Sequence, residues 1–439
     1  MPDARPHPSF AEAFRFWLKL GCISFGGPTG QIAIMHAELV EKRKWISEAR
    51  FLHALNYCML LPGPEATQLA TYIGWLLHRT RGGLAAGVLF VLPSSAMLWG
   101  LSYAYVAYGR VAWVAAIFDG LQPAVVAIVA AALLRIGRRA LRNEVLWALA
   151  ALSFVAIYFF KAPFPLIVFA AAALGFIGGK LWKGKFLPAA PPRPASGGPP
   201  SREAVLGDAA ASPAHTRPTL RRAVKVVAVC LALWWTPVLL LGAWLGWQHT
   251  VIRESVFFSK AALVTFGGAY AVLPYVSQQA VGQYHWLDAS QMLDGLGLAE
   301  TTPGPLIMVL QFVGFLGGWN HPGTLSPLLG ATLGAGVTTW TTFVPCFLWI
   351  FLGAPYIEQM RGHVHLTSAL SAVTAAVVGV ILNLAVWFGG HVLFPASGGM
   401  DWFALVVATV AFTGLVKWKW NIIVVILGSG LLGLAKNLF

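Results

Sequence analysis

Long apolar stretches, separated by short polar, glycine-rich or proline-rich breaks, fill most of this sequence. They predict helices over the ranges 10–34, 51–78, 84–108, 111–134, 145–160, 164–182, 223–247, 255–280, 288–318, 325–353, 366–394, 402–416 and 420–435. A helix needs about 20 apolar residues to cross a bilayer, and most of these stretches approach or exceed that length. The pattern therefore predicts an all-α, polytopic integral membrane protein.

Two of the breaks occur twice in the chain. Phe25-Gly26-Gly27 returns as Phe266-Gly267-Gly268, and Pro62-Gly63-Pro64 returns as Pro303-Gly304-Pro305, both 241 residues later. The same register gives twelve identities over residues 16–64. Glycine and proline set backbone conformation rather than core volume. The repeat thus predicts two homologous halves, each with helices that are broken or re-entrant at these motifs.

The halves are joined by a segment of different composition. We expect a first transporter repeat over 1–182, a flexible cytoplasmic linker rich in proline, glycine and serine over 183–222, an extra span over 223–247 and a second repeat over 248–439. If the first half crosses the membrane an even number of times, the extra span inverts the second half. Inverted repeats are a recurring feature of secondary transporters.

The distribution of basic residues supports this inversion. The polar gaps of the first half contain Lys42, Arg43, Lys44, Arg50, Arg79, Arg81, Arg135, Arg138, Arg139 and Arg142. The equivalent second-half loops 281–287 and 318–325 contain no Lys or Arg. By the positive-inside rule, the N-terminus and linker face the cytoplasm and the C-terminus lies outside.

The four broken segments allow two topologies. The chain makes either thirteen spans, or nine spans plus four re-entrant hairpins. Loops 41–50 and 79–83 are both basic, so both belong on the cytoplasmic side. We therefore favour the hairpins.

The breaks also suggest chemistry. Non-helical backbone at membrane depth requires a protein or water environment, and a helix that restarts there points unpaired N–H groups and about half a positive charge at the break. Such an end binds anions. The residues expected around a small anion are Gly26, Gly27, Gly63, Gly267, Gly268 and Gly304. The alternative, that these glycines only permit close helix packing, stays open.

Charged side chains accompany the breaks. Lys19 and Lys260 each lie seven residues before a glycine pair, on the same helical face, and are candidate counter-charges; the alternative is snorkelling to the membrane surface. Glu65 and Glu300 flank the Pro-Gly-Pro motifs and are candidates for proton coupling, because an intramembrane carboxyl must be protonated, paired or hydrated. For Glu65 the alternative is stabilisation of a helix start.

Polar side chains near the same motifs complete the predicted substrate site. Hydroxyl and amide groups that could donate to oxyanion oxygens belong to Thr67, Gln68, Thr301, Thr302 and Gln311, although each is also a common helix-packing group.

Other classes of function lack their motifs. There is no Walker loop for ATP-driven export. No cofactor is expected: the four cysteines and eleven histidines have no metal-ligand or redox spacing. The chain is 58% hydrophobic and 10% charged, against about 25% charged residues in soluble domains. The net charge of +14 lies mostly in loops, which favours contact with lipid headgroups over nucleic-acid binding.

At the segments Phe25-Gly26-Gly27-Pro28 and Leu61 to Ala70, and at their second-half counterparts, the chain resembles the chromate ion transporter family in its long, two-domain form. The resemblance implies a secondary active transporter in the bacterial inner membrane, not an enzyme. It would export chromate from the cytoplasm, driven by membrane potential or a proton gradient, and confer chromate resistance. The alternative is a transporter of sulfate or another small oxyanion. A homodimer is compatible with the sequence. Ala269 replaces Pro28 in the second half, which favours one asymmetric site.

Overall fold

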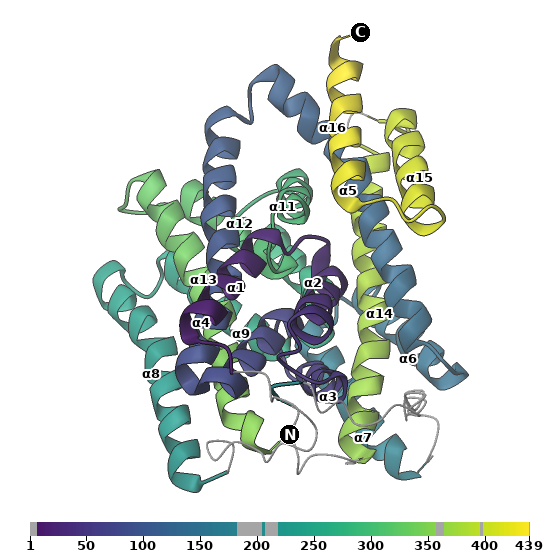
Figure 1. The fold of residues 1–439 in the computed structure, drawn as a ribbon. Coiled ribbons are helices and arrows are strands. Elements are labelled where there is room, and N and C mark those ends of the chain that lie inside the picture. The colour runs from purple at the N-terminus through teal and green to yellow at the C-terminus, as the bar shows by residue number, and fades with distance from the viewer. Residues whose placement is uncertain (1–6, 182–203, 207–217, 357–363, 396–397, 439) are drawn as a thin grey trace.

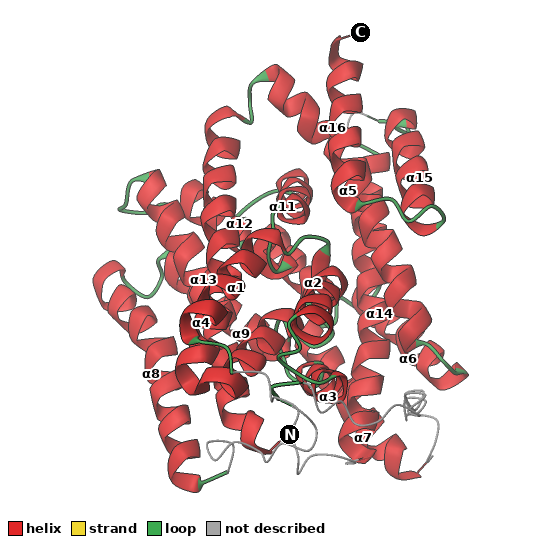
Figure 2. Ribbon diagram, in the orientation of Figure 1, coloured by secondary structure: helices red, strands yellow, loops and turns green. Residues whose placement is uncertain are grey.

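The computed structural model consists of helices joined by loops (Figures 1 and 2). It describes residues 7–181, 204–206, 218–356, 364–395 and 398–438. Within these ranges the extended structure amounts to one isolated bridge between Ile46 and Leu206. The prediction of an all-α protein is confirmed.

The helices follow the predicted stretches closely. Before the linker they are α1 (Phe10–Ile23), α2 (Gly27–His36), α3 (Glu48–Cys58), α4 (Glu65–Tyr108), α5 (Ala112–Ala140), α6 (Glu144–Tyr158) and α7 (Phe164–Leu181). After it they are α8 (Leu220–Leu245), α9 (Thr250–Val264), α10 (Ala269–Ser277), α11 (Ala289–Thr301), α12 (Val309–Asn320), α13 (Pro327–Gly353), α14 (Val364–Leu393), α15 (Trp402–Val416) and α16 (Ile422–Leu438).

The predicted breaks at the duplicated motifs are confirmed. Their glycines have the positive φ angles that favour glycine: Gly26 (87°), Gly27 (69°), Gly63 (122°), Gly267 (82°), Gly268 (87°) and Gly304 (97°). The residues that end α1 and α9 also share one conformation, since Ser24 has φ −82° and ψ 75°, and Thr265 has φ −79° and ψ 83°. The two Phe-Gly-Gly motifs therefore interrupt their helices in the same way.

The structural repetition extends beyond the motifs. A short π-helix follows α2 over Ala37–Lys42, and another follows α10 over Gln278–Gln283. Each is followed by a residue with positive φ, Lys44 at 54° and His285 at 53°. Equivalent positions of the two halves thus have equivalent backbone conformations over a region in which most side chains differ.

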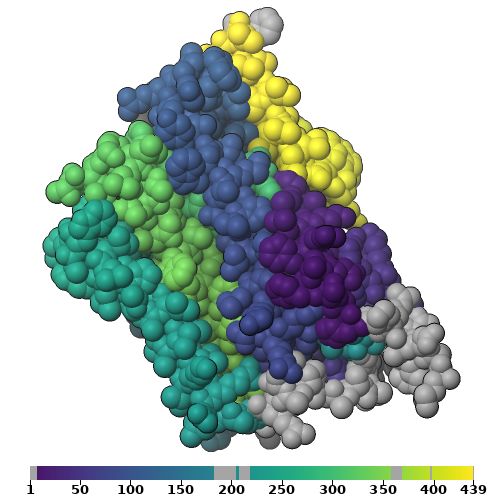
Figure 3. All heavy atoms as spheres, turned by 60° about the vertical axis from the view of Figure 1, so that its left-hand side comes forward, coloured from purple at the N-terminus to yellow at the C-terminus, as the bar shows by residue number. Residues whose placement is uncertain are grey.

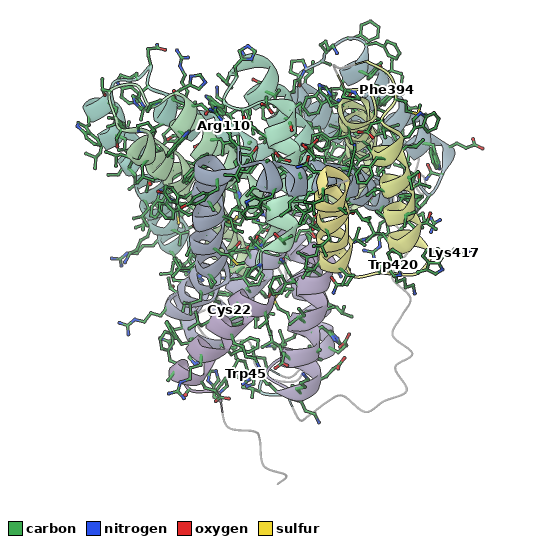
Figure 4. The ribbon with its side chains drawn as sticks, turned by 90° about the horizontal axis from the view of Figure 1, so that it is seen from above. Cys22, Trp45, Arg110, Phe394, Lys417 and Trp420 are labelled. Atoms are coloured by element: carbon green, nitrogen blue, oxygen red, sulfur yellow. The ribbon has the colours of Figure 1, made fainter. Side chains whose placement is uncertain are left out.

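The turns at the far ends of the halves repeat as well. The turn between α6 and α7 contains Lys161 with φ 52°, and the turn between α15 and α16 contains Lys419 with φ 53°. In the second turn the N–H of Trp420 donates to the carbonyl of Gly414 at 3.0 Å. Figure 4 shows Trp420 and Lys417 together at this turn.

One predicted boundary was confirmed and one was wrong. The helix predicted to end at 78 ends there, because His78 (φ −132°, ψ 31°) and Arg79 (φ 55°, ψ −151°) have non-helical angles. The chain folds back at this turn, so that a Cβ at Gly74 would lie 2.5 Å from the carbonyl oxygen of Gly82, and α4 therefore comprises two helices. The helix predicted to end at 134 continues to Ala140. Arg135 and Arg139 therefore lie on the last turns of α5 and not in a connecting loop. The charged residues do not end the helix, because basic residues are favourable at a helix C-terminus.

Helices from one half pack on helices from the other. α5 packs against α15 and α16, while α14 packs against α6 and α7; Figure 1 shows the yellow α15 and α16 beside α5 and α14. Close approach depends on small residues, because a Cβ at Gly120 of α5 would lie 2.7 Å from the Cα of Gly433, and one at Gly175 of α7 would lie 2.5 Å from the Cβ of Ala372.

Six of the described helices are long and apolar enough to cross a membrane: α4, α5, α7, α8, α13 and α14. α6, α15 and α16 are shorter apolar helices. The remaining helices, such as α1 with 14 residues and α10 with 9, are about 14–23 Å long, less than the roughly 30 Å of a bilayer core. The protein is a multi-pass membrane protein, and the choice between thirteen spans and nine spans with four hairpins stays a prediction.

α8, the predicted extra span, lies at the edge of the molecule against α13 (Figure 3). The predicted flexible linker lies largely outside the described residues. Its described part includes Leu206, which is buried and whose N–H donates to the carbonyl of Trp45 at 3.0 Å. This stretch therefore docks on the first repeat, although its composition gave no sign of a buried face.

Candidate functional site

Hydrogen bonds join the four breaks crosswise between the halves. The N–H of Gly63, in the first Pro-Gly-Pro, donates to the carbonyl of Thr265 at 2.7 Å. The N–H of Gly304, in the second Pro-Gly-Pro, donates to the carbonyl of Ser24 at 2.8 Å. Each Pro-Gly-Pro of one half is thus held against the Phe-Gly-Gly region of the other.

The pair of breaks around Gly304 is tightly packed. The buried amide of Gln31 donates to the carbonyls of Gly304 and Ser24. A Cβ at Gly304 would lie 2.6 Å from the Cβ of Ser94 and 2.9 Å from its Oγ. Glycine is required here because φ is positive and because a Cβ would have no room.

A cavity of about 540 Å³ lies beside the other pair of breaks. Residues from α5, α14, the starts of α2, α4 and α10, and the second Phe-Gly-Gly form its walls. Those with chemical relevance are Pro28, Thr29, Glu65, Arg135, Arg139, Arg142, Gly267, Gly268, Tyr270, Ser371 and Thr374. Three of the four breaks therefore contribute directly to one cavity.

The cavity carries a surplus of positive charge. Arg135, Arg139 and Arg142 line it, and none of them forms an ion pair with any side chain in the described ranges. α2 and α10 begin at its wall, and the first N–H groups of a helix have no intrahelical acceptor. Three guanidinium groups and two helix N-termini face a single lining carboxyl, that of Glu65. Such a cavity favours an anion.

The two predicted proton-coupling carboxyls lie at different depths. Glu65 is the first residue of α4, half-buried in the cavity wall, where the charge of Arg139 acts on it. Glu300 is buried at the end of α11 and accepts a hydrogen bond from the hydroxyl of Tyr270. Tyr270 lines the cavity, so one hydrogen bond separates Glu300 from a group on the cavity wall. Arg135 also acts on Glu300 electrostatically.

The predicted lysines lie elsewhere. Lys19 and Lys260 are exposed on α1 and α9, outside the cavity lining. The charge of Lys19 acts on Glu38 of the first π-helix. Their positions match the alternative considered for them, a lysine at the outer surface of a membrane helix.

Most of the predicted polar donors are engaged in the helices themselves. Thr301 and Thr302 donate to carbonyls of their own helix at 2.8 and 2.9 Å, and Gln68 donates to the carbonyl of Pro62 at 2.8 Å. Gln311 joins α12 to α4 by donating to the carbonyl of Ser95 at 2.8 Å. The buried hydroxyl of Thr67 has no partner among the described residues.

Sequence reasoning missed the arginines of the cavity. The sequence predicts a loop for Arg135, Arg139 and Arg142, which holds for Arg142 alone, because α5 continues to Ala140. The spacing of four residues between Arg135 and Arg139 places these two on one helical face, and this was the available signal. Tyr270 was also missed, since nothing in the sequence connects it with Glu300.

A second cavity of about 520 Å³ lies at the opposite end of α5. It is lined by residues near the starts of α5 and α15 and the ends of α14 and α16, including Asp119, Gln122, His391, Asp401 and Lys436. When the Ala-Val-Val at 124–126 of α5 is aligned with the Ala-Val-Val at 376–378 of α14, Asp119 matches Ser371 of the first cavity and His391 matches Arg139. The parts of the two cavities formed by α5 and α14 therefore correspond, with different charges, whereas no residue of the four breaks lines the second cavity.

No group of three or more His, Cys, Asp or Glu side chains in the described part of the chain is placed to hold a metal ion. What these cavities could bind must therefore be judged from their arginines, carboxyls and helix ends.

Comparison with known proteins identifies relatives along the whole chain. The family model described as "Chromate transporter" matches two regions, residues 11–176 and 254–434. A chromate transport protein of Pseudomonas aeruginosa is 33% identical, over 98% of this chain and 94% of the relative. One of Cupriavidus metallidurans is 29% identical with the same coverage. A probable chromate transport protein of Synechococcus elongatus is 26% identical, over 87% of this chain and 86% of the relative. No solved structure matches the chain.

Proposed function

Because the chain belongs to the chromate transporter family, in its long two-domain form, and is a membrane transporter rather than an enzyme, we propose that it exports chromate from the cytoplasm. Export would be driven by the membrane potential or a proton gradient and would confer chromate resistance. The protein would lie in the bacterial inner membrane, with its N-terminus and linker in the cytoplasm and its C-terminus in the periplasm.

The observation that carries this proposal is the cavity with three arginines beside the paired breaks. Chromate is a tetrahedral dianion, and guanidinium groups bind oxyanions through two parallel hydrogen bonds. Arg135 and Arg139 would neutralise the dianion, while the N–H groups of Thr29, Ala269 and Tyr270, at the starts of α2 and α10, would bind its oxygens. The glycines Gly26, Gly63, Gly267 and Gly304 would hold the backbone in the required shape.

Proton coupling would follow from the carboxyls of the same cavity. An ionised Glu65 repels a bound dianion, so anion binding would favour a proton on Glu65. A proton that leaves with the dianion would still leave a net negative charge, so with this coupling export would be driven by the membrane potential. Glu300 would act through Tyr270. The backbone around the site would be supported by Thr67, Gln68, Thr301 and Thr302. Lys19 and Lys260 would attract the anion electrostatically from the surface.

Two cavities at opposite ends of the α5 and α14 pair support alternating access. In transporters with inverted repeats, the halves exchange conformations, so the access path on one side resembles that on the other. The cavity at Arg139 would open to the cytoplasm, which its basic residues support by the positive-inside rule, and the cavity at Asp119 would lie on the release side. The higher density of positive charge on the loading side would favour binding of the anion from the cytoplasm.

The test is uptake of labelled chromate into everted membrane vesicles energised by respiration. Arg139→Gln removes a charge-assisted interaction of about 1.5–3 kcal/mol, which lowers affinity by roughly 10- to 150-fold. Arg138→Gln is the matched control, because Arg138 is an exposed neighbour that does not line the cavity. Equal chromate affinity in the two variants would contradict the proposed site. Sulfate that competes as well as unlabelled chromate would favour the alternative of a broader oxyanion transporter.

A further inference from the structure

One carboxyl group lies outside both cavities and is completely enclosed. Glu254 is on α9 with no exposed surface. Neither of its side-chain oxygens has a hydrogen-bond partner among the described residues. Buried polar groups in proteins are nearly always paired, so this residue requires an explanation.

The space around Glu254 is made by two glycines. A Cβ at Gly317 of α12 would lie 2.2 Å from Oε1, and a Cβ at Gly334 of α13 would lie 2.7 Å from Oε2. The side chain of Trp286 closes the slot, since it lies 3.1 Å from the same Cβ position at Gly317. Any larger residue at these two positions would displace the carboxyl. The fold thus contains a slot shaped for this group between three helices.

No charge on the surrounding elements compensates an ionised Glu254. On α9 itself, Lys260 is exposed, and Arg253 is exposed and donates to Gln248 at 2.8 Å. Of the nearby histidines, His249 contacts the carbonyl of Pro322 at 3.1 Å, and His321 contacts the carbonyl of His285 at 2.9 Å. On α8, which also contacts α9, the charged residues are Arg221, Arg222 and Lys225, near its start. α12 and α13 contain no charged residue, and α10, which also contacts α9, has the phenols of Tyr270 and Tyr275 but no charged residue.

A carboxylate without donors or counter-charge is far less stable in such a slot than the neutral acid. Glu254 therefore holds a proton in the conformation seen here. It can release this proton only to water, and water reaches it only if α9 separates from α12 and α13. Release is the ionisation of a carboxylic acid to a carboxylate and a hydrated proton.

We propose that Glu254 is a proton-binding site separate from the anion cavity, loaded when α9 packs against α12 and α13 and emptied when they separate. The equivalent residue of the first half is Ala13 on α1, which has no ionisable group. Only the second half would then exchange a proton in this way, so the two halves differ in proton chemistry as well as in the charges of their cavities. The transport consequence of this site rests on the proposed function, whereas its protonation does not.

The first experiment detects the proton directly. Infrared spectra of the purified protein are recorded at neutral pH for wild type, Glu254→Gln and Glu12→Gln. Glutamine keeps the shape but cannot ionise, and Glu12 is an exposed carboxyl on α1, next to the position equivalent to Glu254. We expect the carbonyl band of a buried, protonated carboxylic acid to be lost in Glu254→Gln alone. A band that is unchanged in this variant would overturn the proposal. If Glu254→Gln does not fold, Glu254→Asp should shift the same band.

The second experiment measures chromate uptake in liposomes with and without an imposed pH gradient. Glu254→Gln should reduce stimulation by the gradient at least tenfold, while chromate affinity stays within twofold of wild type. Stimulation equal to that of wild type would show that the proton on Glu254 is structural and does not turn over. If no variant transports chromate but the infrared band still depends on Glu254, the substrate assignment fails and the protonated site stands.

Discussion

Replacing Gly304 with alanine should strongly destabilise the contact between the two halves. Gly304 has φ 97°, where an L-residue with a Cβ is strained by about 1–2 kcal/mol. Its new Cβ would also lie 2.6 Å from the Cβ of Ser94, and overpacking of this kind costs about 1–3 kcal/mol. The sum is about 2–5 kcal/mol, and displacement would also weaken the hydrogen bond from the Gly304 N–H to Ser24.

Gly26→Ala is the matched control for this prediction. Gly26 has a similar φ of 87°, but a Cβ there meets no atom within 4 Å. It should lose only the strain of about 1–2 kcal/mol. The difference between the two variants measures the steric clash alone.

The clash can also be relieved. Adding Ser94→Gly to Gly304→Ala removes both atoms that the new Cβ would meet, and should recover about 1–3 kcal/mol relative to Gly304→Ala in a double-mutant cycle. The assay is reversible unfolding in mixed detergent micelles, followed by tryptophan fluorescence, with chromate uptake as a second readout. Equal destabilisation by Gly26→Ala and Gly304→Ala, with no recovery from Ser94→Gly, would refute the predicted packing of the two breaks.

Two further predictions concern single side chains. Tyr270→Phe leaves the buried Glu300 without its donor, so it should cost about 1–3 kcal/mol of stability and slow transport. Unfolding and chromate uptake measure these two effects, and unchanged stability would show that the hydrogen bond contributes nothing. Asp401 caps α15 by accepting from the N–H of Ala404 at 2.9 Å, so Asp401→Ala should cost about 1 kcal/mol. Partial burial raises the pKa of Asp401, but hydrogen bonds from Ala404 and Lys436 outweigh this effect and leave the pKa below its ordinary value. The stabilisation is therefore present above the ordinary pKa of aspartate and is lost as pH falls through the lowered value. From pH 7 to pH 3, the free energy of unfolding of wild type should approach that of Asp401→Ala.

The sequence predicted the helices and their interruptions because the signals are local. Gly-Gly and Pro-Gly-Pro restrict the backbone whatever surrounds them, and the structure places a break at each. Which breaks would meet was not predictable in this way. The hydrogen bonds from Gly63 to Thr265 and from Gly304 to Ser24 cross between halves, and their pairing depends on tertiary packing.

The positions of the charged side chains relative to the cavity were harder to predict than the helix breaks. Basic residues usually mark the end of a membrane helix and so predict a loop at Arg139, yet α5 extends past Arg139, which lines the cavity. The symmetry of Lys19 with Lys260 predicts a role at the anion site, but both lie at the surface. Glu254 belongs to no motif and has no counterpart in the first half, so no sequence pattern points to it. The repeat therefore identified what the two halves share, whereas much of the chemistry lies where they differ.

The exchange of helices between the halves has a consequence for biosynthesis. α5 finds its partners α15 and α16 only near the end of translation, some three hundred residues after its own synthesis. Until then its small-residue face, including Gly120, must be shielded by lipid or by the insertion machinery. The first half thus enters the membrane as an incomplete structure. Its final packing waits for the last helices of the chain, so a ribosome that stops before α15 leaves behind a product that quality-control proteases can recognise.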